Sequence, residues 1–529
     1  MSDGSMTPSP SSTPLASRIW SRDASVWSID SATQSNIANR LGWLDGPQWL
    51  ASRAESLSEW ATDLRSRGFT QAVLIGMGGS SLAAEVIAEV LGSAADGLSL
   101  TVLDSTHPDA INAALGGRAW SRILFLFSSK SGSTIEVQSL CTWVMDNLEE
   151  QGIAEPGAQC VAITDPNSAL AELAAQRRFL DCIENPTDIG GRFSALSAFG
   201  MAPAALMGAS LEAMSQHATR MAAACRNLEP APNPGLELGQ WLFAQWQQGR
   251  DCLQLVIEER YASLASWIEQ LLAESLGKNG KGLLPLSGAE PAAPTSRLAR
   301  VIIGASQSNT FWQSVSVDSD DDVSAFSIRL DADEALGGEF FRWSFATAVA
   351  GALLDVNPFD EPDVAASKAI TRHLLDAEGL NDEPQITPWT ELKAALESAP
   401  PKSYLAILNY MAPDPVISDL IEDFAGRVRN RFGLPVTVNV GPRYLHSTGQ
   451  FHKGGSPEGI FLFLRGESEF DLDIVTEDFG FAGLNQAQAM GDCAELARRG
   501  RTVSWVELDG NRFSQIQGLR LILQECLEG

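Results

Sequence analysis

The segment Phe125–Glu136 places hydroxyl side chains around one cation. After the apolar residues Phe125–Phe127 come Ser128, Ser129, Lys130, Ser131, Ser133 and Thr134, and helix-compatible sequence follows. Hydroxyl groups and backbone N–H groups at a helix N-terminus, beside a cation, can bind a phosphate. Ser133 and Glu136 also have the spacing of a capping box, which would serve only to start the helix.

A glycine-rich turn precedes this segment. Val73–Leu82 runs from an apolar stretch through Gly76, Gly78, Gly79 and Ser80 into a helix-like sequence. Glycines let the backbone turn tightly and approach an anion. The spacing is neither the dinucleotide fingerprint nor a P-loop, because the third glycine and the Gly-Lys-Ser/Thr are absent. A turn without a ligand is an equally good interpretation of this motif alone.

The elements that must position these loops alternate between strand and helix, which predicts parallel sheets covered on both faces. The predicted strands form three groups. They are Gln71–Ile75, Leu100–Leu103, Ile123–Phe127 and Val161–Ile163; Leu253–Ile257, Arg300–Ile303 and Ala325–Leu330; and Tyr404–Leu408, Pro435–Val440, Ile460–Leu464 and Val503–Leu508.

The predicted fold class is therefore α/β, with doubly wound parallel-sheet domains. Residues 1–14 form a Ser/Pro-rich tail and 15–54 a helical segment. The first sheet domain spans 55–228 and the second spans 235–380, separated by the Pro-rich Glu229–Pro234. A C-terminal α/β section spans 400–529.

The charge balance excludes some classes of partner. Lys plus Arg number 37 and Asp plus Glu 66, a net charge of −29, which repels nucleic acid and anionic membranes. A phosphate site must therefore rely on local donors. The N-terminus lacks a signal peptide and no stretch approaches the roughly 20 apolar residues of a membrane span, so we expect a cytoplasmic protein.

Neither a metal nor a cofactor is expected. The seven cysteines are scattered, without a Cys-x-x-Cys pair, and favour reduced thiols. The acidic run Asp318–Asp322 contains carboxylates that are able to bind a divalent cation, but a solvated loop is the favoured interpretation.

Together the two loops resemble the sugar isomerase (SIS) domain, and three further motifs resemble the glucose-6-phosphate isomerase family. Gly190-Gly-Arg-Phe-Ser194 is similar to the G-G-R-[FY]-S signature. Gln270–Lys278 is similar to the Q-x-x-x-E-S-x-G-K segment that holds the base. Asn357–Lys368 is similar to N-x-F-D-Q-x-G-V-E-x-x-K. These matches occur in the family's order and imply two SIS-type domains.

The flanking segments resemble the isomerase half of bifunctional transaldolase/glucose-6-phosphate isomerase proteins. They are Leu15–Asp23, Asn39–Asp45, Gly441–Gly455 and Gln486–Asp492. No transaldolase half is recognisable. The family resemblance implies a homodimer, and association with a separate transaldolase stays open.

The resemblance implies an aldose–ketose isomerase that interconverts glucose 6-phosphate and fructose 6-phosphate through an enediolate. Glu274 would move the proton between C2 and C1, Arg192 would stabilise the enediolate, and Lys368 would lie near the ring oxygen. The residues expected to bind phosphate or substrate are Gly79, Ser80, Ser129, Lys130, Ser131, Thr134, Gly191 and Gln270.

The ring-opening histidine departs from the family's pattern, because none lies between Glu274 and Lys368. Thr448-Gly-Gln450 resembles the loop around the usual histidine, so we expect His446 or His452 to reach the site, from the same or a partner subunit. Glu361, Asp363 and Ala365 also replace the family's usual residues. Two alternatives stay open: an isomerase that also accepts mannose 6-phosphate, and a non-catalytic phosphosugar-binding module.

Overall fold

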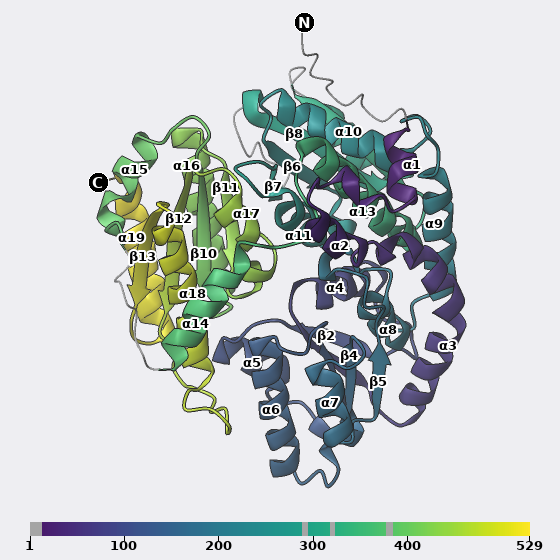
Figure 1. Ribbon diagram of the computed structural model, residues 1–529. Helices are drawn as coiled ribbons and strands as arrows, with labels where there is room; N and C mark the ends of the chain where they lie inside the picture. The colour runs from purple at the N-terminus through teal and green to yellow at the C-terminus, as the bar shows by residue number, and fades with distance from the viewer. Residues whose placement is uncertain (1–12, 288–294, 318–322, 377–384, 529) are drawn as a thin grey trace, which may run out of the picture.

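The computed structural model describes residues 13–287, 295–317, 323–376 and 385–528, and it contains three parallel sheets (Figure 1). The acidic run at 318–322 and most of the N-terminal tail lie outside the described residues. Before the first sheet come α1 (Leu15–Trp20), α2 (Ser31–Ala38) and α3 (Gly46–Ser66). Helix α3 continues past residue 54, where the sequence analysis ended the helical segment.

The first sheet has the order β2-β1-β3-β4-β5. Its strands are β1 (Gln71–Gly76), β2 (Ser99–Leu103), β3 (Ile123–Ser128), β4 (Cys160–Thr164) and β5 (Asp181–Glu184). Alternate residues of each strand face opposite sides. One face packs on α3, α4 (Leu82–Leu91) and α8 (Ala198–Leu206), and the other packs on α5 (Pro108–Leu115), α6 (Ile135–Glu150) and α7 (Ala169–Gln176). Both phosphate-type loops thus leave neighbouring strands at one edge.

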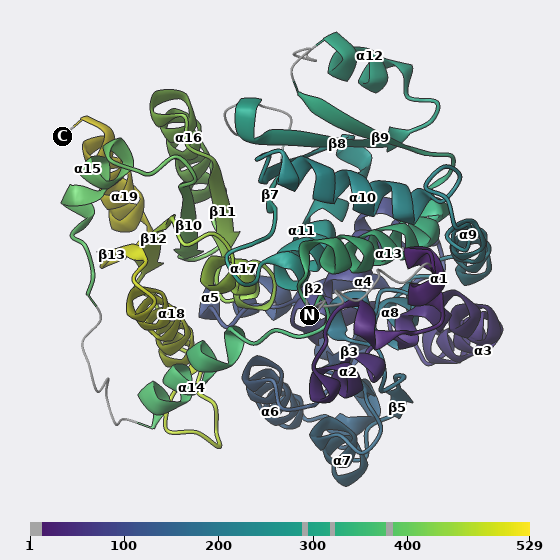
Figure 2. The same cartoon turned by 45° about the horizontal axis from the view of Figure 1, so that its top comes forward.

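The second sheet has the order β7-β6-β8-β9. Its strands are β6 (Cys252–Ile257), β7 (Leu284–Ser287), β8 (Leu298–Ala305) and β9 (Ser324–Leu330). The helices α9 (Leu211–Ala224), α10 (Pro234–Gln247), α11 (Leu264–Leu276) and α13 (Leu336–Leu354) share one core with the first sheet, and α12 (Asn309–Val317) covers the opposite face (Figure 2).

The third sheet has the order β11-β10-β12-β13 and stands beside the other two (Figure 1). Its strands are β10 (Tyr404–Tyr410), β11 (Val436–Val440), β12 (Gly459–Gly466) and β13 (Thr502–Leu508). Its helices are α15 (Leu392–Glu397), α16 (Pro415–Phe432), α17 (Gly449–Gly454), α18 (Phe481–Arg498) and α19 (Arg512–Glu528), and α14 (Val364–Leu375) packs on α18.

The α/β class and all eleven predicted strands are confirmed. The two strands that the sequence analysis missed, β5 and β7, lie at sheet edges and have only four residues each. The first ends with an exposed Glu184 and the second contains Pro285, features that weaken an apolar strand pattern.

The Pro-rich stretch Glu229–Pro234 joins α9 to α10, and both helices pack on α13. Pro234 stands at the first turn of α10, and the Asn233 side chain accepts a hydrogen bond from Leu236 N at 2.9 Å. The chain therefore turns here within a shared core, and the division at 228 and 235 stays a prediction. No helix among the described residues is long and apolar enough to cross a membrane.

Candidate active site

A buried carboxyl and a buried guanidinium face each other where the first two sheets meet. Glu274 lies near the C-terminal end of α11, and Arg192 lies in the turn η6 (Gly191–Phe193). Arg192 Nη1 is 3.4 Å from Glu274 Oε1, and the two side chains are 4% and 13% exposed. The pair brings together two of the predicted catalytic residues from positions far apart in the chain.

Every nitrogen of the Arg192 guanidinium donates a hydrogen bond. Its Nε donates to Ser275 Oγ at 2.8 Å, and its Nη2 donates to the carbonyl oxygens of Pro358 and Asp360. Its Nη1 donates to Glu361 Oε2 at 3.0 Å. The guanidinium is thus fixed in one orientation and is shared between Glu274 and Glu361.

A second buried cation, Lys278, holds the loop that contains Asp360 and precedes α14. Lys278 is only 3% exposed, and its Nζ donates to Asp360 O at 2.6 Å and to Asp360 Oδ1 at 2.8 Å. Burial, reinforced by Arg192, lowers the pKa of Lys278 to about 8. Lys278 therefore secures the backbone that Arg192 also grips.

Burial raises the pKa of Glu274 above that of an ordinary glutamate, against the opposing effect of Arg192. Glu361 raises it further through its charge. Glu361 is half-exposed; burial favours its neutral form, but Arg192 outweighs this and lowers its pKa. A buried carboxyl with a raised pKa is what a general base working near neutral pH needs.

The glycine loop lies under this pair rather than open to solvent. A Cβ on Gly79 would lie 2.1 Å from Gly191 O, and Gly78 has φ +55 with Gln270 Nε2 and His446 O both 2.7 Å from its Cβ position. Only glycine allows such close backbone approach. The predicted binding residues Gly79 and Gly191 are therefore adjacent, and Ser80, 9% exposed, follows in the same turn.

Gln270 joins the base to the third section. Its Nε2 is 3.2 Å from Glu274 Oε2 and donates to His446 O at 2.8 Å. Its Oε1 is buried and accepts no hydrogen bond from the described residues. This acceptor is available to a ligand hydroxyl.

The hydroxyl loop forms one wall of a cavity. Ser131, Ser133 and Thr134 line it, facing Lys368, Arg372 and His446. The cavity therefore brings together residues that were predicted to bind phosphate or to act in catalysis. Arg372 adds a second cation on α14 beside Lys368. The sequence analysis missed Arg372, although it lies one helical turn after Lys368.

Two other residues of the hydroxyl loop have internal partners. Ser129 is buried, bonds to Thr134 Oγ1 at 3.1 Å and accepts from Gly132 N. Lys130 pairs with Asp165 and donates to Thr187 O at 2.9 Å. In this structure both side chains shape the loop rather than line the cavity.

The capping-box interpretation of Ser133 and Glu136 is wrong. Helix α6 begins at Ile135 with Thr134 as its N-cap, and no side chain caps it. Glu136 instead lies 2.9 Å from His446 Nε2 and accepts from Gln488 Nε2 at 2.7 Å. Burial opposes the ionisation of Glu136, but His446 outweighs it and lowers the pKa of this carboxyl.

The structure separates the two candidate histidines. His446, at the end of the turn η11 (Arg443–His446), lines the cavity. His452 is fully buried among Tyr404, Phe451 and Phe461, and its Nδ1 is 3.0 Å from Tyr404 Oη. Burial lowers the pKa of His452 far below its ordinary value, so it stays neutral in the core. His452 is therefore enclosed in the core, whereas His446 lines the cavity, as expected for one of the two.

Among the described residues, no group of three or more His, Cys, Asp or Glu side chains is arranged to hold a metal ion. The site nevertheless combines a buried carboxyl, a fixed guanidinium and a cavity lined by hydroxyl groups and cations. It also contains a histidine oriented by a carboxylate.

Known proteins resemble this chain over part of its length. A family model for phosphoglucose isomerase matches residues 52–313. A glucose-6-phosphate isomerase from Synechococcus sp. (strain JA-2-3B'a(2-13)) is 34% identical over 215 residues, which is 40% of each chain. One from Rubrobacter xylanophilus is 28% identical over 378 residues, 60% of this chain and 85% of the relative. The chain is thus similar to phosphoglucose isomerases over just under half of its length.

Solved structures share the family's fold. A hypothetical protein from Thermus thermophilus has a TM-score of 0.58 and 23% identity, over 68% of this chain and 94% of that chain. A glucose-6-phosphate isomerase from Chlamydia trachomatis has a TM-score of 0.54 and 17% identity, over 69% and 78%. The match to the phosphoglucose isomerase family ends at residue 313, so Lys368 and His446 lie beyond it.

Proposed function

We propose that this protein interconverts glucose 6-phosphate and fructose 6-phosphate. The observation that carries the proposal is the buried Glu274 carboxyl, 3.4 Å from the fixed Arg192 guanidinium, beside a cavity lined by hydroxyl groups and cations. The alignment with the Synechococcus relative covers only 40% of that relative, so the activity and the substrate are proposals for this chain.

The substrate's phosphate binds at the N-terminus of α6. Ser131, Ser133 and Thr134 supply hydroxyl and backbone donors there, and Lys368 and Arg372 supply positive charge. This local donor set overcomes the repulsion expected from a chain of net charge −29.

Ring opening uses the His446–Glu136 pair. The Glu136 carboxylate accepts from Nε2–H of His446 and so fixes the tautomer and the orientation of the ring. Nδ1 is then the atom that exchanges a proton with the sugar, while Lys368 stabilises charge on the ring oxygen.

Isomerisation uses Glu274 and Arg192. The carboxylate takes the proton from C2 and returns it to C1 on the same face of the enediolate. The guanidinium of Arg192 stabilises the negative charge that develops on the two oxygens, and no reorganisation is needed because its hydrogen bonds already hold it. The Oε1 of Gln270 accepts from a sugar hydroxyl.

A non-catalytic module that binds a phosphosugar would need only the residues that bind the phosphate. The contact between the buried Glu274 carboxyl and Arg192 favours an enzyme over this alternative. An isomerase that also accepts mannose 6-phosphate is retained as the second alternative. Cytoplasmic location, a homodimer and association with a transaldolase are retained as proposals, with support only from sequence composition and resemblance.

The test is turnover of fructose 6-phosphate without added metal, with glucose 6-phosphate detected by a coupled dehydrogenase. Glu274→Gln should lose at least about 100-fold in kcat, because the general base is removed. Glu259→Gln, an exposed carboxyl just before the same helix, serves as the matched control and should keep its activity. An inactive wild type that fructose 6-phosphate still stabilises against heat would identify a binding module instead.

A further inference from the structure

A second cavity, of about 820 Å³, lies between the first sheet and the third. Its walls come from α4, the residues after β2, the start of α11 and the ends of β10 and β11. None of the residues proposed above for catalysis or phosphate binding lines it. Its volume falls within the range of about 300–1,000 Å³ that is usual for small-molecule sites.

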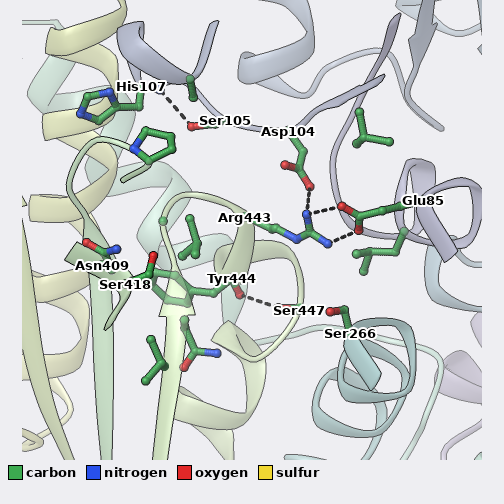
Figure 3. A pocket seen from close by; sticks show the side chains of 18 of the residues that line it. Glu85, Asp104, Ser105, His107, Ser266, Asn409, Ser418, Arg443, Tyr444 and Ser447 are labelled. Carbon is green, nitrogen blue, oxygen red and sulfur yellow. Dashed lines mark hydrogen bonds and ion pairs between the residues drawn. The ribbon is translucent and has the colours of Figure 1, made fainter. Parts of the chain in front are cut away.

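The cavity contains more negative than positive charge. Arg443 crosses from the third section and meets Asp104 at 3.1 Å and Glu85 at 2.9 Å (Figure 3). Glu269, on α11, is a third carboxyl that acts on the same guanidinium. One cation thus faces three carboxyl groups, and burial raises the pKa of Glu269 to about 7 and that of Asp104 above its ordinary value.

One buried amide oxygen in this cavity is a hydrogen-bond acceptor without a partner among the described residues. Asn439, at the end of β11, is 4% exposed, and its Oδ1 accepts no hydrogen bond from the described residues. The Glu269 carboxyl is part-exposed and lines the same cavity. An unsatisfied buried acceptor is unfavourable, and an occupant with N–H donors would satisfy it.

We propose that this cavity binds a small organic cation whose ammonium groups donate to Glu269 and Asn439. A positive charge there offsets the excess of carboxylates, whereas an anion would be repelled. The chemistry differs from that of the catalytic cavity, which is lined by cations and takes a phosphate. The inference does not depend on the proposed isomerase activity.

Spermidine is the probe, and calorimetric titration of the full chain at about 0.15 M salt is the measurement, because salt screens attraction to the acidic surface. We expect saturable binding near one molecule per chain. Glu269→Gln and Asn439→Leu should each weaken it about tenfold, as loss of one charge-assisted or one buried hydrogen bond implies. Glu55→Gln, an exposed carboxyl on α3, is the matched control and should bind like the wild type.

Absence of saturable binding in the wild type would overturn the proposal. Equal spermidine affinity in the wild type and Glu269→Gln would overturn it too, because the binding would then belong to the acidic surface in general. If thermal melting shows that Glu269→Gln is unfolded, Asn439→Leu decides alone by the same criterion. Tetraethylene glycol, a neutral chain of similar length, should not bind, and equal binding by it would contradict the requirement for ammonium groups.

Discussion

At the residue scale, the chemistry depends on how the Arg192 guanidinium is shared. Its Nη1 lies 3.0 Å from Glu361 and 3.4 Å from Glu274. Glu361 stands where the resemblance to the family led us to expect glutamine, and the sequence alone left its role open. In the structure the Glu361 carboxylate contacts Arg192 Nη1, the same guanidinium nitrogen that lies near Glu274.

Replacing Glu361 with glutamine should therefore change both substrate affinity and pH dependence. Because Glu274 must be ionised to act, kcat/KM falls as the pH falls through its raised pKa. Glu361 contributes to that rise, so Glu361→Gln should move the acid limb of the kcat/KM profile to lower pH and decrease KM. Glu361→Asp, which keeps the charge, is the control. An acid limb that stays in place would show that Glu361 does not act on the base.

The His446–Glu136 contact gives a second prediction at this scale. Glu136→Gln should reduce turnover of fructose 6-phosphate about 10- to 100-fold, because the histidine loses the carboxylate that fixes its tautomer. Erythrose 4-phosphate cannot close a stable ring, so its isomerisation needs no ring opening and should be affected much less. Glu149→Gln, an exposed carboxyl on the same helix, is the control. Equal losses on both substrates would contradict a role confined to ring opening.

At the element scale, three segments are tied together by one buried carboxylate. Asp492, on α18, pairs with Lys453 on α17, and both side chains are fully buried. It also accepts from Tyr444 Oη at 2.6 Å and from Ser367 Oγ at 3.0 Å. Tyr444 lies in the turn that carries His446, and Ser367 directly precedes Lys368. The network thus positions both predicted ring-opening residues.

Removing the charge of Asp492 should be costly. Asp492→Asn leaves Lys453 buried without a counter-charge, so the free energy of unfolding should fall by about 3–5 kcal/mol, measured by urea denaturation. The comparison is Arg67→Gln, which breaks the exposed pair with Asp63 and should cost about 1 kcal/mol or less. Similar losses for the two variants would mean that the buried pair contributes no more than a surface pair.

At the scale of the whole molecule, the third section brings two polar side chains to the cavity of its own chain. His446 and Gln488 come from this section and meet Glu136 of the first sheet within one chain. The sequence left open whether the histidine would come from the same or a partner subunit. In this arrangement the proposed ring-opening histidine comes from the same chain, so we expect catalysis that needs no residue from a partner subunit, whether or not the protein forms the dimer that its family resemblance implies.

A mixing experiment tests this arrangement. Glu274→Gln and His446→Gln each inactivate the chain that carries them, so a mixture of the two, refolded together, should stay inactive. Specific activity of the wild type should also be independent of protein concentration. Recovery of a substantial share of wild-type activity in the mixture would mean that a partner subunit supplies the histidine.

The sequence by itself determined the local elements and the motifs that they carry. Apolar runs between turn residues predicted eleven strands, and Gln270, Glu274 and Lys278 matched the family segment that holds the base. These features depend on residues that are close together in the sequence, so they can be recognised from short-range patterns alone. The family match over residues 52–313 covers much of this same part.

Only the tertiary structure decided which distant groups meet. Glu136 and His446 are 310 residues apart, and nothing in the capping-box spacing of Glu136 indicates that partner. His446 and His452 are alike in sequence context, yet one lines the cavity and the other lies in an aromatic core. Packing between sheets, which depends on the whole chain, determines these contacts and therefore the protonation and role of each side chain.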